Sequence, residues 1–251
     1  MSLIKEELQT SKKNLTQRRI VTNDIDLDDL KNGEIIVQIE NFAFTSNNVT
    51  YGVAGEMMGY WQFFPTMNDP ENIWGCIPMW GFAEIKYSNN KELEVGERLF
   101  GYFPASNILT LKPIKISQKT FIDGEEHRKE LPPVYNNYIR LNNEDNYNKN
   151  NDNIRALLFP LHITSFCLCD YLQNENYLGA EQVIIVSASS KTAIGLAQGL
   201  QSEEKKPEII GLTSKRNSEF VKSLNSYDQI YSYDDLGDIN INNSSVMVDM
   251  A

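Results

Sequence analysis

Residues 182–201 read QVIIVSASSKTAIGLAQGLQ, and this stretch decides the fold class. Gln182–Ser187 contains a continuous run of β-branched residues, which is typical of a parallel strand buried on both faces. A few small residues follow, and Thr192–Gln201 has the composition of a helix. A buried strand that passes through a tight turn into a helix is the repeating unit of α/β proteins, so the stretch predicts a parallel sheet covered by helices.

The same alternation continues on both sides of this stretch. A helix precedes it, and strands and helices follow in turn towards the C-terminus. Sheets of this class usually have about six strands, and four are predicted before the sequence stops at Ala251. We therefore expect a partial Rossmann-type sheet and a chain that is truncated at its C-terminus. The predicted elements are helices over 156–172 and 218–224 and strands over 208–213, 229–231 and 245–249.

The first half of the chain has the signals of short strands separated by turns. Prolines at 65, 70, 78, 104, 113, 132 and 133 are incompatible with long helices. Strands are predicted over 34–40, 81–87, 97–103 and 108–111, and together they indicate a compact barrel. Residues 141–153, LNNEDNYNKNNDN, have almost no apolar side chains, so a solvated loop is predicted there. The predicted domains are a barrel over 1–153 and a partial Rossmann-type domain over 154–251.

Composition excludes several classes of partner. The formal net charge is −11 and the sequence has no basic block, which disfavours binding to nucleic acid or to an anionic membrane surface. Three cysteines are too few for a disulfide framework and favour a reducing compartment. The N-terminus has no apolar signal core, and we expect the chain to be cytoplasmic.

The turn between the strand and the helix of the opening stretch is the best candidate site. Small residues there would let a pyrophosphate approach backbone N–H groups at the positive end of the helix. The usual G-x-G-x-x-G fingerprint is absent, and Ser187, Ser190 and Ala193 are the small residues in glycine-like positions of the turn. A plain strand-to-helix turn with Ser and Ala caps explains the segment about equally well. The candidate cofactor-binding residues of this turn are Ser187, Ser189, Ser190, Lys191 and Thr192.

A second clue stands at the end of the next strand, where the sequence reads Thr213-Ser-Lys-Arg-Asn217. A cofactor with a free 2′-hydroxyl is usually met there by Asp or Glu. Ser214, Lys215 and Arg216 instead suit a 2′-phosphate, which points to NADP(H). A solvated helix start with incidental charges is the alternative, although cations are disfavoured at that end of a helix.

Several ordered stretches resemble the zinc-free quinone and enoyl reductases of the medium-chain dehydrogenase/reductase superfamily. They are NGEIIVQIENFA (32–43), VGERLFG (95–101), FPLHITS (159–165), LGAEQVIIVSAS (178–189) and YDQIYSY (227–233). SASSKTAIGLA, GLTSKRN, GYFPAS and LPPVYNNYIR are similar to an uncharacterised subfamily of these proteins. The resemblance implies a GroES-like barrel followed by a Rossmann-type cofactor domain. It also implies that Thr164 faces the nicotinamide and that Tyr233 lies against the adenosine end.

The zinc-binding members of the superfamily have a Cys shortly after the first barrel strand and Gly-His-Glu before the second. Here Phe44–Asn48 offers no thiolate, and Cys76–Gly81 has no His or Glu. Three cysteines cannot fill a four-cysteine structural site either. We therefore predict no zinc and no other metal. Cys167 and Cys169 are two residues apart on a predicted helix and are expected to be core residues rather than ligands.

A zinc-free reductase needs hydrogen-bond donors to polarise its substrate. Relatives place such groups after the first barrel strand, which implies Asn48 and Tyr51 as candidate catalytic residues, although both could merely shape a loop. The first hypothesis is an NADPH-dependent reductase acting on an activated double bond or carbonyl of a small molecule, with a homodimer possible for a full-length form. The alternative is a non-catalytic relative that binds nucleotide or serves as an interaction module.

Overall fold

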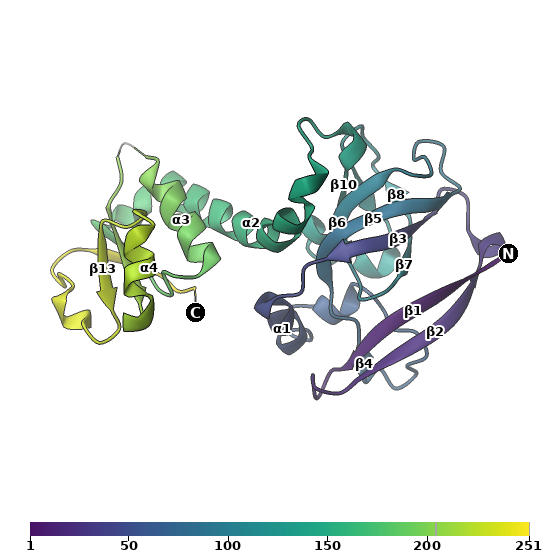
Figure 1. Ribbon diagram of the computed structural model, residues 1–251, viewed down its shortest axis with the longest axis horizontal. Coiled ribbons are helices and arrows are strands. Elements are labelled where there is room, and N and C mark those ends of the chain that lie inside the picture. The colour runs from purple at the N-terminus through teal and green to yellow at the C-terminus, as the bar shows by residue number, and fades with distance from the viewer. Residues whose placement is uncertain (204, 251) are drawn as a thin grey trace. The chain divides into compact units, whose positions relative to one another are not determined.

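The computed structural model describes residues 1–203 and 205–250 and divides into two compact units, Met1–Leu157 and Leu158–Ala251 (Figure 1). Each unit has its own hydrophobic core. No helix within the described residues is long and apolar enough to cross a lipid bilayer. The predicted fold class, α/β with a β-rich first part, is confirmed.

Unit 1 is built on an antiparallel sheet of seven strands in the order β7-β3-β5-β6-β10-β9-β8. Because β7 and β8 follow one another in the chain but lie at opposite ends of this order, the sheet curls into a nearly closed barrel. The predicted compact barrel is therefore confirmed. The strands are β3 (Ile35–Phe42), β5 (Met79–Ser88), β6 (Arg98–Phe103), β7 (Ile108–Leu111), β8 (Pro113–Ile114), β9 (Thr120–Asp123) and β10 (Asn137–Arg140).

The barrel interior is filled by side chains that alternate along the strands. Ile35 and Val37 of β3 and Ala83 and Ile85 of β5 all point into one cluster and are fully buried. Burial of a branched aliphatic side chain contributes about 1.5–3 kcal/mol, so this alternation accounts for the closure of the sheet. The strands predicted over 34–40, 81–87, 97–103 and 108–111 correspond to β3, β5, β6 and β7.

A second, smaller sheet in unit 1 was not predicted from the sequence. It has the order β2-β1-β4, with β1 over Ser2–Ser11, β2 over Arg18–Asp26 and β4 over Trp74–Gly75. The β1/β2 hairpin carries several apolar side chains outward: Ile4, Leu8 and Ile20 are 59%, 39% and 70% exposed. Its inward face is mixed, with buried Glu7 and Gln9 beside partly buried apolar residues, so neither face has the apolar pattern of a strand that packs on a core.

The Asn-rich stretch 141–153 is more ordered than the predicted solvated loop. It contains two 3-10 turns, Leu141–Asn143 and Lys149–Asn151, and α2 already begins at Asp152. The Arg98 guanidinium pairs with Asp152 and Glu40, and Tyr147 donates to Asp152 at 2.8 Å. Polar side chains order this stretch through hydrogen bonds, which hydropathy alone does not register.

Unit 2 contains a parallel sheet of four strands in the order β13-β12-β11-β14. The predicted partial Rossmann-type sheet is therefore confirmed. Its elements are α2 (Asp152–Asn174, shared with unit 1), β11 (Gln182–Ile185), α3 (Lys191–Gln201), β12 (Glu208–Thr213), α4 (Ser218–Ser223), β13 (Gln229–Ser232) and β14 (Ser245–Val248).

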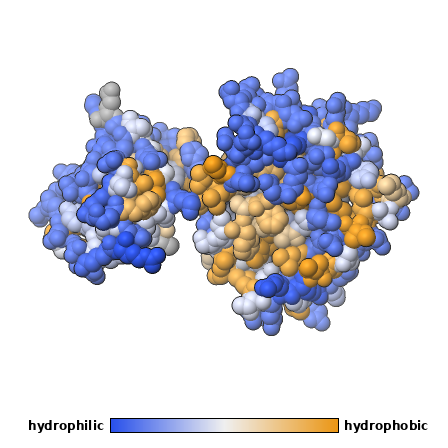
Figure 2. Space-filling model, viewed as in Figure 1, coloured by the Kyte–Doolittle hydropathy of each residue, from blue (hydrophilic) through white to orange (hydrophobic). Residues whose placement is uncertain are grey.

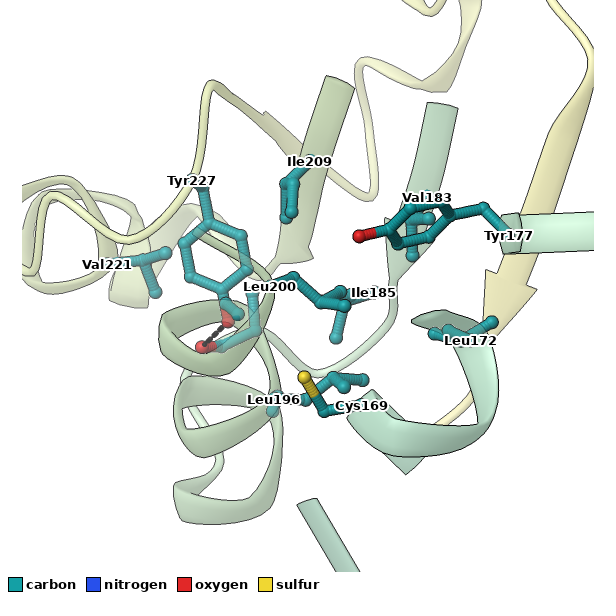
Figure 3. Close-up of a cluster of buried hydrophobic side chains, with 13 residues drawn as sticks. Cys169, Leu172, Tyr177, Val183, Ile185, Leu196, Leu200, Ile209, Val221 and Tyr227 are labelled. Carbon is teal, nitrogen blue, oxygen red and sulfur yellow. Dashed lines mark hydrogen bonds between the residues drawn. The ribbon is translucent and has the colours of Figure 1, made fainter. Parts of the chain in front are cut away.

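Side chains of α2 and α3 cover one face of this sheet (Figure 3). Cys169 and Leu172 of α2 and Leu196 of α3 pack in one cluster with Val183 and Ile185 of β11. The two helices approach closely because small residues meet: a Cβ on Gly195 would lie 2.7 Å from Ser165 Oγ, and one on Gly199 would lie 2.9 Å from Cys169 Sγ. Cys169 is thus a core residue as expected, whereas Cys167 is exposed and that part of the prediction is wrong.

A buried ion pair between Arg128 and Asp123 stabilises the part of the barrel around β9 and β10. Arg128, 1% exposed, donates through Nη1 to Asp123 and to the Tyr138 hydroxyl, and through Nη2 to the Tyr135 carbonyl at 3.0 Å. Asp123 also accepts from the Lys112 N–H at 2.9 Å. This network connects β9, β10 and the turn between them.

Replacing Asp123 by Ala leaves the Arg128 guanidinium buried without its carboxylate. We expect the free energy of unfolding to fall by about 3–5 kcal/mol, measured by urea unfolding. Asp145→Ala is the matched control, because it breaks the fully exposed Lys119–Asp145 pair and should leave the unfolding midpoint nearly unchanged. Equal midpoints for the two variants would contradict this view of the Arg128 network.

Candidate cofactor-binding site

The turn between β11 and α3 has an unusual backbone. Ser187 has φ +56°, in the left-handed region that glycine adopts without strain and that costs another residue about 1–2 kcal/mol. The Ser187 N–H donates to the Tyr233 hydroxyl at 3.0 Å, and its Oγ lies 3.5 Å from the same oxygen. Tyr233 follows β13 and is partly exposed. The serine therefore adopts a glycine-like conformation, and a tyrosine hydroxyl accepts its backbone hydrogen bond.

The next residues start α3 in the way that their types predict. Ser190 is the N-cap, since its Oγ accepts from the Ala193 N–H at 3.2 Å. Lys191 is the first helical residue and is exposed. The carbonyl of Thr192 accepts from Ser165 Oγ of α2 at 2.8 Å. The N-terminal end of α3 is thus held by the Ser190 cap and by the hydrogen bond from Ser165 of α2. Its first residue, Lys191, carries a positive charge.

The turn after β12 lies beside the first one. Because β11 and β12 are parallel, both turns leave the sheet at the same edge. Asn217 Nδ2 donates to Ser189 Oγ at 3.0 Å and links the turns directly. Ser214 is half-buried, and Lys215 and Arg216 are exposed.

A carboxylate already pairs with one of these cations. Lys215 Nζ lies 3.1 Å from Asp234 Oδ2, and this carboxylate raises the pKa of Lys215 above its usual value. Both side chains are about two-thirds exposed, so the pair is solvent-screened.

Most of the predicted cofactor-binding residues therefore gather around two neighbouring turns. Thr164 differs, because its hydroxyl is exposed and donates to the Pro160 carbonyl one turn earlier in α2. Its neighbour Ser165 makes the link to α3 instead. Two further residues of this site, Asn217 and Asp234, were not singled out from the sequence, although Asn217 stands within the GLTSKRN stretch. The residues that gather are Ser187, Ser189, Ser190, Lys191, Thr192, Ser214, Lys215, Arg216 and Tyr233.

The candidate catalytic residues of unit 1 lie on a short helix rather than in a loop. α1 spans Ser46–Val53, with Thr45 as its N-cap in a capping box. Asn48 completes that box: Oδ1 accepts from the Thr45 N–H at 2.7 Å, and Nδ2 donates to the Pro78 carbonyl at 3.0 Å. Asn48 is buried, and its position ties α1 to the segment before β5.

Tyr51 lies on the same helix among other aromatic rings. Its ring centroid is 4.6 Å from that of Tyr60 and 5.8 Å from that of Tyr102. Burial, followed by the nearby Tyr60, raises the pKa of the Tyr51 hydroxyl to about 12. The hydroxyl therefore stays protonated near neutral pH and can donate a hydrogen bond but is a poor base.

Among residues 1–203 and 205–250, no group of three or more His, Cys, Asp or Glu side chains is arranged to hold a metal ion. The Cys76 thiol is buried and lies 3.7 Å from the Leu8 carbonyl. Desolvation raises the pKa of that thiol well above its usual value. Cys76 is therefore a packed thiol next to the β1/β2 hairpin.

Several solved structures have a similar fold, and proteins named as reductases are among them. TarJ from S. aureus, in complex with NADPH, has a TM-score of 0.56 at 10% identity and matches 99% of this chain and 65% of its own. A mutant enoyl thioester reductase from Candida tropicalis has a TM-score of 0.53 at 14% identity and matches 92% and 61%. A protein assigned as an NADPH:quinone reductase, from Bacillus thuringiensis, has a TM-score of 0.54 at 12% identity and matches 93% and 60%.

The chain thus spans about three-fifths of the length of the solved structures that it matches. A comparison with curated protein sequences finds no match. The family described as "Protein of unknown function (DUF2855)" matches residues 42–251, which include most of the barrel and all of unit 2. The chain therefore belongs to the DUF2855 family and has the fold of the medium-chain dehydrogenase/reductase superfamily.

Proposed function

We propose that unit 2 binds NADP(H) and that the protein is a zinc-independent reductase of activated double bonds or carbonyls. The observation that carries the proposal is the pair of linked turns at the carboxyl edge of the parallel sheet. Ligands of such sheets bind outside the carboxyl ends of their strands. Ser187–Ser190 has only short side chains, and the capped start of α3 follows it, so a pyrophosphate fits there.

Charge supports NADP(H) over NAD(H). The end of β12 carries Lys215 and Arg216 where an NAD-binding protein has a carboxylate. Arg216 is exposed, and Lys215 is held only by the solvent-screened contact with Asp234. A 2′-phosphate, with its higher charge, can compete with Asp234 for the lysine.

In this proposal the nicotinamide supplies the hydride, and Asn48 or Tyr51 polarises the substrate oxygen. Support for zinc independence comes from the residues at Phe44–Asn48 and Cys76–Gly81, which replace the ligands of the zinc-binding members. α1 and the turn after it expose four large apolar side chains, Val49, Val53, Met57 and Met58, beside three polar ones. Figure 2 shows apolar surface over this region of unit 1, which favours a small substrate with an apolar part.

The remaining expectations belong to the same proposal. The small number of cysteines favours a reducing compartment such as the cytoplasm. The acidic charge of −11 disfavours nucleic acid and anionic membranes as partners. A full-length form can pair as a homodimer, as we infer from the resemblance to the zinc-free reductases.

The second candidate function is that of a non-catalytic member that keeps the reductase fold. Three contacts favour it: Tyr233 accepts the Ser187 N–H, Asp234 pairs with Lys215, and Asn48 is engaged in a helix cap. Each of them uses a group that a reductase would turn towards cofactor or substrate. Binding and turnover measurements separate the two functions.

NADPH is expected to bind the protein saturably and more tightly than NADH, as followed by protein fluorescence. The double variant Lys215→Ala/Arg216→Ala should weaken NADPH about 10–100-fold and leave NADH nearly unchanged, because two charge-assisted hydrogen bonds are lost. Lys222→Ala is the matched control, since this exposed lysine of α4 pairs with Glu219 of the same helix and should change neither affinity. Saturable binding of neither nucleotide would overturn the cofactor proposal.

Tyr233→Phe tests whether the Ser187 N–H is a phosphate donor. The variant keeps the ring but removes the hydroxyl that competes for this N–H, so NADPH should bind about 2–10-fold more tightly. Tyr233→Ala, which also removes the ring, should bind it more weakly than the Phe variant. Identical NADPH affinities for Tyr233→Phe and the unmodified protein would show that the hydroxyl and the pyrophosphate do not compete.

Tyr51→Phe tests the polarising group. The ring contacts with Tyr60 and Tyr102 remain, so folding and NADPH binding should be unchanged while kcat for NADPH oxidation with menadione falls about 100-fold. Tyr60→Phe is the control of equal size in the same cluster. A kcat that is the same in both variants would exclude Tyr51 from this role, and no turnover in the unmodified protein would favour the non-catalytic function.

A further inference from the structure

The β1/β2 hairpin turns a charged face towards the barrel. Along β1 the inward positions carry Lys5, Glu7 and Gln9, and Glu7 is only 1% exposed. Leu3, Val21 and Ile25 share this face and are partly buried, and the other apolar residues of the hairpin point outward. Burying a charged group is costly unless it is paired, so a face that mixes charged and apolar residues closes a hydrophobic core poorly. It is a suitable wall for a polar binding site.

A cavity of about 290 Å³ lies between this hairpin face and the barrel, wholly within unit 1. Phe63, Phe64 and Pro65 from one segment and Ile108 of β7 supply apolar walls. Two cations and three carboxylates also line it, and these five side chains carry one net negative charge. The charged lining residues are Lys5, Glu7, Asp123, Glu125 and Arg128.

Two of the carboxylates are fully used within the protein. Glu7 Oε1 accepts from Gln9 Nε2 at 2.7 Å and from the Met67 N–H at 3.0 Å, and its Oε2 pairs with Lys5 at 3.1 Å. Asp123 is occupied by Arg128 and by the Lys112 N–H. These two therefore balance the charges of Lys5 and Arg128 but offer nothing to a ligand.

Both hydrogen-bond donors and a hydrogen-bond acceptor remain without a full set of partners. Lys5 Nζ has donors left beyond its contact with Glu7, and Arg128 Nε is buried with no hydrogen-bond partner among the described residues. On the acceptor side, the half-buried Glu125 carboxylate meets only the His127 ring within the described chain, at 3.9 Å from Nδ1. His127 Nε2 is held by the Phe63 carbonyl at 3.2 Å, which leaves Nδ1 facing Glu125.

We propose that this cavity binds a small amino acid with an apolar side chain. Its ammonium group pairs with Glu125, its carboxylate with Lys5 beside Arg128, and its side chain lies against Phe64, Pro65 and Ile108. A simple anion would meet the net negative charge of the cavity, and a simple cation would leave the spare donors of Lys5 unused. A zwitterion satisfies both ends and adds no net charge.

The test compares three probes that share the isobutyl side chain of leucine, by isothermal titration calorimetry on the whole chain. L-Leucine carries both charges, 3-methylbutylamine only the positive one, and 4-methylpentanoate only the negative one. Leucine should bind with a dissociation constant of about 1 mM or tighter, and each singly charged probe at least about tenfold more weakly. This outcome does not depend on cofactor binding by unit 2.

Glu125→Gln should weaken leucine at least about tenfold, because it removes the partner of the ammonium group. Glu126→Gln is the matched control: the neighbouring carboxylate is 87% exposed and does not line the cavity, so leucine should bind this variant as it binds the unmodified chain. Equal affinity for leucine and either singly charged probe would overturn the proposal. So would no binding of leucine, valine or proline up to about 10 mM, or equal effects of the two variants.

Discussion

The peptide group of Ala188 fixes the turn on which the candidate cofactor site depends. Its N–H donates to the Leu212 carbonyl of β12 at 2.9 Å, and its carbonyl accepts from the buried Tyr227 hydroxyl at 2.8 Å (the dashed line in Figure 3). A Cβ on Gly211 would lie 2.9 Å from Tyr227 and 3.0 Å from Ala188 Cβ, so this approach requires glycine in β12. The turn is therefore fixed relative to β11, β12 and the segment before β13, and this fixes the positions of the side chains around it.

The same constraint explains how a turn without glycines can have a glycine-like shape. Ser187 is in the left-handed region directly before the pinned Ala188. Hydrogen bonds to Tyr233 and, through Ser189, to Asn217 offset part of the strain. A pyrophosphate that replaced the Tyr233 hydroxyl would form a comparable bond at the same N–H. The departure from G-x-G-x-x-G is thus compatible with phosphate binding, provided that Tyr233 can move.

The parallel half of the fold was predictable because its strands are buried and its turns are short. The β-branched run of β11 and the helix pattern of α3 agree with the structure within about two residues.

In the barrel half, the hairpin β1/β2 was missed because Ile4, Leu8 and Ile20 point outward and Lys5, Glu7 and Gln9 point inward. α1 was not predicted, because its start is defined by the capping box of Thr45 and Asn48 rather than by apolar spacing. Within the candidate site, the residues at the strand ends could be predicted, because the topology of a parallel sheet places them at the same edge. The partners Asn217 and Asp234 could not, because side-chain pairing depends on the packed geometry.

Cofactor binding at the two linked turns is the central claim, and backbone amide resonances test it most directly. In ¹H–¹⁵N spectra of the whole chain titrated with NADPH, the largest shifts should fall on the amides of Ser187–Thr192 and Ser214–Arg216, with the Ser187 amide among them. Shifts confined to other parts of the chain, or none at saturating NADPH, would contradict the assignment of this site.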